Sequence, residues 1–132
     1  MQFIETRGND GQKAQKVNFS EAILSPSASY GGIYVPEFLP VFDTEFLSLH
    51  IDSHYKTLAL AVLQGFEIDI DEATLSEALS RYDAFDDPSN PVPLVKIEED
   101  CFVAELYHGP TRAFKDMALQ PFGYVLARGS KT

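Results

Sequence analysis

The sequence has 132 residues, of which 45% are hydrophobic and 23% charged, which is typical of one globular domain with its own core. Its net charge of −10 argues against nucleic acid or an anionic membrane surface as a partner. No apolar run approaches the roughly 20 residues of a membrane span, and the N-terminus lacks the basic start and apolar stretch of a signal peptide, so we expect a cytoplasmic protein.

The first quarter of the chain predicts short elements. Weak alternation over residues 1–6 predicts an edge strand with Phe3 facing inward. A turn is expected at residues 7–11, which are rich in Gly, Asn and Asp. A short strand at residues 17–19 then leads into a brief helix at residues 20–24.

A tight bend is predicted next, because Gly31 and Gly32 tolerate backbone conformations that other residues avoid. Residues 33–35 then read as extended, between the bend and a pair of prolines. A short helix at residues 43–49 should follow.

Two firmer helices follow in the middle of the chain. The first is predicted to begin at a Ser53 cap and to end at Gly65 as a left-handed C-cap. The second is predicted to begin at an Asp71 cap. Their apolar faces are Tyr55, Leu58, Ala59, Val62 and Leu63 in the first, and Leu75, Ala78, Leu79 and Tyr82 in the second.

The turn-rich segment 85–91 reads as a linker. We therefore expect a helical N-terminal domain with small strands over residues 1–90, and the start of a second, α/β domain over residues 91–132. The fold class is α/β overall and α+β within these 132 residues.

Two strands are predicted within the second part, at residues 92–97 and 101–107. The later one is apolar on both faces except for Glu105, which predicts a strand that enters a covered sheet. The single cysteine, Cys101, cannot form an internal disulfide. Packing within a buried strand is its expected role.

The stretch 108–116, His-Gly-Pro-Thr-Arg-Ala-Phe-Lys-Asp, contains the candidate functional residues. Thr111 is a good N-cap, and the predicted helix face is Phe114, Met117, Ala118, Phe122 and Val125, with a kink or an end at Pro121. Arg112 and Lys115 would then lie in the first turn, where the helix dipole disfavours cations.

Two cations at that end indicate an anion nearby. Residues 106–132 also carry four basic side chains against one acidic, on an otherwise acidic chain. A small anionic ligand suits this distribution better than a polyanion. A solvated lysine face would produce the same pattern, and charge alone does not separate the two.

The same nine residues resemble the cofactor-lysine motif of the threonine synthase family, which uses pyridoxal 5′-phosphate (PLP). The segment Gly-Gly-Ile-Tyr-Val-Pro at 31–36 is also similar to that family, although Tyr30 stands where an aspartate is usual. The resemblance implies the second large PLP fold, with two α/β domains and the cofactor in the cleft between them. It also implies that Lys115 holds PLP covalently, and that Phe114 and Asp116 help to shape or orient it.

By the same resemblance, the reaction converts O-phospho-L-homoserine and water into L-threonine and phosphate. Lys115 would shuttle the protons, with PLP as the electron sink. Family members are several times longer, and their phosphate-binding loop lies beyond the lysine helix. We therefore expect an N-terminal part that lacks its C-terminal catalytic domain and is inactive alone.

Two other functions stay open. One is a sibling PLP enzyme, such as a dehydratase or a β-replacing synthase, and the other is a non-catalytic binding module. No metal site is expected, because His50 and His54 have no third ligand clustered with them. We expect His108 to orient its loop by a hydrogen bond rather than to act as a base.

Overall fold

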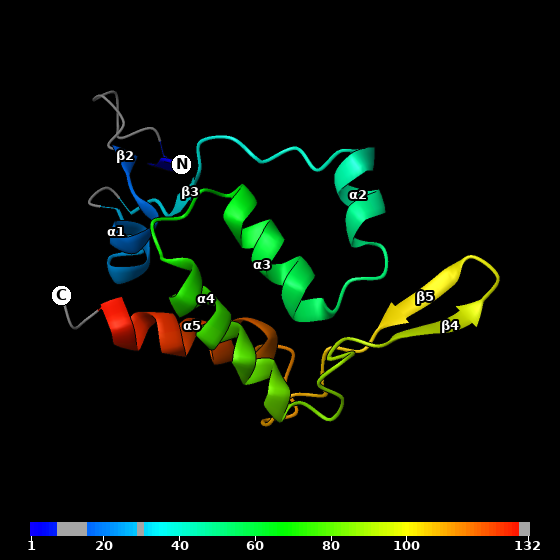
Figure 1. Ribbon diagram of the computed structural model, residues 1–132. Coiled ribbons are helices and arrows are strands. Elements are labelled where there is room, and N and C mark those ends of the chain that lie inside the picture. Colours follow the sequence, from blue (N-terminus) through cyan, green and yellow to red (C-terminus); the bar gives the residue numbers. More distant parts are fainter. Residues whose placement is uncertain (8–15, 29–30, 130–132) are drawn as a thin grey trace.

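The computed structural model describes residues 1–7, 16–28 and 31–129. They form a small antiparallel sheet, a group of packed helices and a separate hairpin, which together are an α+β arrangement as predicted (Figure 1). Residues 8–11 of the predicted turn, and Tyr30, lie outside the described residues.

The first sheet has three strands, β1 (Phe3–Glu5), β2 (Lys16–Val17) and β3 (Tyr34–Pro36), in the order β2-β1-β3. The prediction of an edge strand at the N-terminus is wrong, because β1 pairs antiparallel with both neighbours and lies in the centre. Phe3 faces inward as predicted, and it packs with Val17 in a small core.

Helix α1 (Phe19–Leu24) begins with a capping box. The Asn18 side chain accepts from the Glu21 N–H at 2.7 Å, and the Glu21 carboxylate accepts from the Asn18 N–H at 2.9 Å. This reciprocal pair satisfies two backbone donors. The helix therefore starts one residue earlier than predicted, and strand β2 is correspondingly short.

The predicted bend at the glycine pair is present. Gly31 has a φ of 82°, a conformation that favours glycine. A Cβ on Gly32 would lie 2.5 Å from Glu5 Oε2, so a side chain there would displace this buried carboxylate. The bend returns the chain to pair β3 with β1.

Helix α2 (Thr44–His50) follows an Asp43 cap, close to the predicted bounds. Helix α3 (Tyr55–Gly65) differs from its prediction at both ends. His54, not Ser53, is the N-cap residue, and its side chain makes no capping bond. The Ser53 hydroxyl lies 3.2 Å from His50 Nδ1 instead.

The C-terminal end of α3 does not use a left-handed glycine. Gly65 is the last helical residue, and the positive φ of 46° falls on Glu67. Close packing accounts for the glycine, since a Cβ there would lie 2.9 Å from the Phe42 ring.

Helix α4 (Glu72–Leu79) starts at Asp71 as predicted, with the carboxylate accepting from the Thr74 N–H at 2.9 Å. A 3-10 helix, η2 (Ser80–Ala84), continues it. The main core forms around this pair of helices, and Tyr82 donates its hydroxyl to the Met117 carbonyl at 2.6 Å. The core comprises buried Leu79, Tyr82 and Phe85, with Tyr55, Ala59, Leu60, Leu63 and Met117 packed against them.

Strands β4 (Leu94–Glu98) and β5 (Cys101–Ala104) form an antiparallel hairpin that projects away from the helices (Figure 1). Every residue of both strands is exposed. The prediction of a covered sheet is therefore wrong for this chain, and so is the burial of Cys101, which is exposed. The apolar run in β5 has no layer to pack against within the described residues.

Helix α5 (Asp116–Gly129) packs on α4 and η2 and continues through Pro121, which does not end it. Val125 is buried on the inner side, whereas Ala118 and Phe122 of the predicted face are exposed. Within the residues that the structure describes, no helix has both the length and the apolar character to cross a bilayer.

Candidate functional site

The motif 108–116 joins the hairpin to α5 and ends on the first residue of that helix, and we call it the lysine loop. Two backbone hydrogen bonds fix its approach. The Glu105 N–H donates to the Pro93 carbonyl at 3.0 Å, and the Asp86 N–H donates to the His108 carbonyl at 3.1 Å. The second bond joins the loop to the segment that follows η2, so the motif is tied to the helical part of the molecule.

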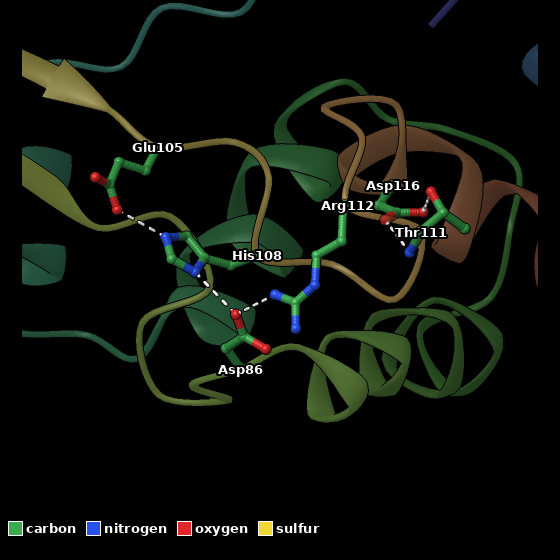
Figure 2. A network of polar contacts seen from close by, with 6 residues as sticks. All are labelled: Asp86, Glu105, His108, Thr111, Arg112 and Asp116. Atoms are coloured by element: carbon green, nitrogen blue, oxygen red, sulfur yellow. Dashed lines mark hydrogen bonds and ion pairs between the residues drawn. The ribbon is translucent and has the colours of Figure 1, made fainter.

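The His108 ring lies between two carboxylates (Figure 2). Its Nδ1 is 3.0 Å from Asp86 Oδ2, and its Nε2 is 2.7 Å from Glu105 Oε2. Ionised carboxylates only accept hydrogen bonds, so this arrangement favours the protonated ring, in which both nitrogens donate. Glu105, and then Asp86, raise the pKa of His108. The ring holds the loop by hydrogen bonds, as its position beside the Gly-Pro turn suggested.

Asp86 also accepts from Nη1 of Arg112, on the same oxygen that meets His108. Arg112, and then His108, lower the pKa of the Asp86 carboxyl. The backbone of Arg112 has a φ of 59°, which is uncommon and strained for a residue with a side chain. Arg112 therefore lies in a loop and not in a helix first turn, so that placement is wrong. The anion beside Arg112 is the Asp86 carboxylate.

A second set of contacts closes the far end of the loop. The Thr111 N–H donates to Asp116 Oδ2 at 2.8 Å, and the Thr111 hydroxyl donates to Asp116 Oδ1 at 2.9 Å. Gln120 donates to the same carboxylate at 3.0 Å. Gln120, and then Thr111, lower the pKa of Asp116, which is only 3% exposed.

The prediction that Thr111 caps the helix is therefore wrong. Its hydroxyl donates to the Asp116 side chain, and α5 begins at Asp116, five residues later. Gly109 fits the same arrangement, because a Cβ there would lie 2.5 Å from both Cβ and Oδ2 of Asp116. We call Gly109, Thr111 and Asp116 the loop clasp.

Lys115 lies at the end of the loop, directly before α5. Its carbonyl accepts from the Leu119 N–H at 2.8 Å, so the hydrogen bonding of the helix begins at this residue. The side chain is exposed, and it makes no hydrogen bond or ion pair with any residue that the structure describes. The loop thus holds the Lys115 backbone in place and leaves the amine accessible.

Lys115 borders a hollow of about 720 Å³. Phe114, which is 64% exposed, lies beside it. Lys115 is the only charged member of the lining among the described residues, and the other members are Tyr55, Val92, Leu106, Phe114, Met117, Ala118 and Leu119. A planar organic group could pack on this surface within reach of the lysine.

The structure thus brings two of the three predicted site residues together, since Lys115 and Phe114 line one hollow. Asp116 is turned into the loop clasp. The roles assigned to all three stay predictions. Sequence reasoning missed Asp86, which lies in a turn-rich segment without periodicity. It noted Glu105 only as the polar exception in an apolar strand, and that exception was the available signal.

Other parts of the molecule offer less chemistry. Across the described ranges, no three His, Cys, Asp or Glu side chains gather as they would around a metal ion. A cavity of about 530 Å³ between α3, α4 and α5 is lined by apolar and aromatic residues alone. Among the described residues, the lining of this cavity provides no charged group for a reaction.

Comparison with known proteins identifies the family. Residues 2–82 match the family model described as the threonine synthase N terminus. The threonine synthase of Methylobacillus glycogenes is 34% identical over the whole chain, which spans 30% of that protein. The threonine synthase of Pseudomonas aeruginosa is 38% identical over 96% of the chain, which spans 26% of that protein.

Two crystal structures show the same fold. The PLP-bound threonine synthase of Brucella melitensis matches 99% of the chain with a TM-score of 0.89 and 33% identity. Threonine synthase from Escherichia coli matches 98% with a TM-score of 0.81 and 26% identity. The chain covers 28% of each of these proteins. The resemblance seen in the lysine motif is confirmed, and the chain belongs to the threonine synthase family.

Proposed function

We propose that this chain is the lysine-bearing part of a PLP-dependent lyase that converts O-phospho-L-homoserine and water into L-threonine and phosphate. The observation that carries the proposal is the loop at 108–116, which fixes the Lys115 backbone and leaves its side chain free beside an apolar hollow. The match to a PLP-bound threonine synthase supports the choice of cofactor.

The described residues fit one end of PLP. The Lys115 amine could hold its aldehyde carbon, and Phe114 and Tyr55 offer aromatic surface to the ring. Among the described residues, the lining of the hollow supplies no second cation or hydroxyl cluster for the phosphate. That group therefore requires residues outside this hollow, as the longer chains of the relatives would allow.

When bound, PLP supplies an electron sink that makes protons beside the substrate amino group acidic. Lys115 contributes the rest from this chain. Its amine would hold the cofactor and would take up and return protons at the substrate carbons. Phosphate leaves from the γ-carbon, and water adds at the β-carbon.

We further propose that the 132 residues alone do not turn over substrate. Lys115 borders an open hollow, and reactions of this kind need a site that excludes water and orients the substrate. The chain also spans only 26–30% of the two bacterial relatives named above. Phosphate release from O-phospho-L-homoserine by this chain alone would contradict this part of the proposal.

The cofactor role can be tested by reducing a mixture of the chain and PLP with borohydride and mapping the product by mass spectrometry. Label on Lys115 above the level on Lys96, an exposed hairpin lysine, is the expected result. Lys115→Ala should abolish the selective label and Lys96→Ala should not. Equal label on the two lysines would remove the support for a cofactor site in this chain.

The reaction itself needs a longer protein that contains this chain together with the regions that its relatives possess. Phosphate and threonine formed together from O-phospho-L-homoserine would support a threonine synthase. Conversion of serine or threonine to a keto acid without phosphate release would indicate a sibling dehydratase instead. PLP binding without any turnover would indicate a non-catalytic module.

A further inference from the structure

Asp86 contacts the lysine loop at three points although it lies in a different segment. Its N–H donates to the His108 carbonyl at 3.1 Å, and its Oδ2 accepts from both the His108 ring and the Arg112 guanidinium. Phe85, the residue before it, is 4% exposed and belongs to the main core. Asp86 is therefore fixed to the helical part of the molecule and reaches out to the loop (Figure 2).

The charges around this residue are complementary. His108 bridges Asp86 and Glu105, and Arg112 pairs with Asp86, so two cations meet two carboxylates. Tyr107 stacks on the His108 ring with 4.6 Å between ring centroids. Within the described structure, the titratable groups that contact His108 are Asp86, Glu105 and Tyr107, and those that contact Asp86 are His108 and Arg112. The hairpin end, the segment after η2 and the lysine loop each contribute to the set.

We propose that Asp86 is a positioning residue for Lys115. Asp86 fixes the lysine loop through His108 at the start of the loop and Arg112 in its middle. The role in catalysis rests on the proposed function, whereas the positioning needs no cofactor. Asp86 acts through these two side chains.

The strained backbone at Arg112 explains why the contact between Asp86 and Arg112 matters for the shape of the loop. A residue with positive φ keeps that conformation only where its surroundings hold it. Asp86 holds the Arg112 side chain, and the loop clasp holds Thr111, the preceding residue. Release of one of these contacts lets the loop relax toward ordinary φ values, and Lys115, three residues further on, moves with it.

The test compares Asp86→Asn with Asp83→Asn in the 132-residue chain. Both variants exchange a carboxylate for an amide, and Asp83 instead pairs with Lys56 on the helical part. NMR titration of the His108 ring and hydrogen exchange of the Arg112 N–H report on the loop. Acetic anhydride labelling of Lys115, relative to Lys96, reports on the lysine without any cofactor.

In Asp86→Asn we expect the His108 pKa to fall, because one of its two carboxylate partners is lost. We also expect the Arg112 N–H to exchange several-fold faster and the labelling ratio of Lys115 to Lys96 to change. Asp83→Asn should leave all three unchanged, and Asp86→Glu should restore part of the effect. An Asp86→Asn variant with unaltered loop exchange and labelling ratio would overturn the proposal. Equal PLP label on Lys115 and Lys96 in the unaltered chain would remove support for the proposed cofactor site and would leave the positioning role intact, since none of these three measurements uses PLP.

Discussion

The Asp116 carboxylate accepts two hydrogen bonds from Thr111, one from the backbone N–H at 2.8 Å and one from the hydroxyl at 2.9 Å. The two residues enclose the four between them in a closed turn, and Lys115 is the last of these four. Hydrogen bonds to a buried carboxylate are stronger than neutral ones. The position of the lysine at the start of α5 is therefore coupled to a contact that does not involve the lysine side chain.

Loss of the Thr111 hydroxyl should loosen this turn. We expect Thr111→Val to increase hydrogen exchange at the Thr111 and Asp116 amides several-fold, because one of the two bonds from Thr111 to the carboxylate is gone. Thr111→Ser keeps the hydroxyl and is the matched control, with exchange close to that of the unaltered chain. Equal exchange in both variants would show that the backbone bond alone closes the turn.

Gly109→Ala should destabilise the chain by about 1–3 kcal/mol, because its methyl group would overlap Asp116 and force the loop clasp to shift. Gly123→Ala is the control. It lies in α5 with nothing within 4 Å of the added Cβ, and helix propensity predicts a gain of up to about 1 kcal/mol. Urea denaturation of both variants measures the two free energies of unfolding, and changes of the same sign would contradict the steric explanation.

Structure that depends on neighbouring residues could be predicted from the sequence, whereas structure that depends on a side-chain partner could not. Local signals such as the Asp71 cap and the apolar face of α4 depend on neighbouring residues, and they were predicted correctly. Thr111 looked like a cap because Thr is a good one, but the partner that overrides this preference, Asp116, acts through its side chain.

Contacts between distant segments left no local pattern. Asp86 meets His108 across 22 residues and Arg112 across 26, so no periodicity connects them. The exposure of the β4–β5 hairpin was missed for a related reason. An apolar strand indicates that something covers it, and the described residues of this chain supply no covering layer.

In the main core, Tyr82→Phe should lower the free energy of unfolding by about 1 kcal/mol, because the Met117 carbonyl loses its hydrogen bond. Burial, and then Tyr55, raise the pKa of Tyr82, so the hydroxyl stays protonated as a donor at neutral pH. Tyr124→Phe removes a more exposed hydrogen bond with Arg128 and should change stability by less than about 0.5 kcal/mol. A larger loss in the Tyr124 variant would contradict this ranking.

The contacts of His108 predict how stability depends on pH. The His108 pKa is raised above its ordinary 6.5, so its contribution is fully present below that value and is lost as pH rises through the folded-state pKa. The pKa values of Asp86 and Glu105 are lowered from 3.8 and 4.5. Their contribution is present above those ordinary values and is lost as pH falls through the lowered ones.

The two dependences together predict greatest stability from these contacts at mildly acidic pH, between the carboxylate and imidazole titrations. Thermal unfolding measured from pH 4 to 9 should show a decline on the alkaline side that His108→Gln removes, because the amide does not titrate. His54→Gln is the control, since no hydrogen bond to the His54 side chain is found within the described residues, and it should keep the decline. A decline that persists in His108→Gln would assign the alkaline loss of stability to another group.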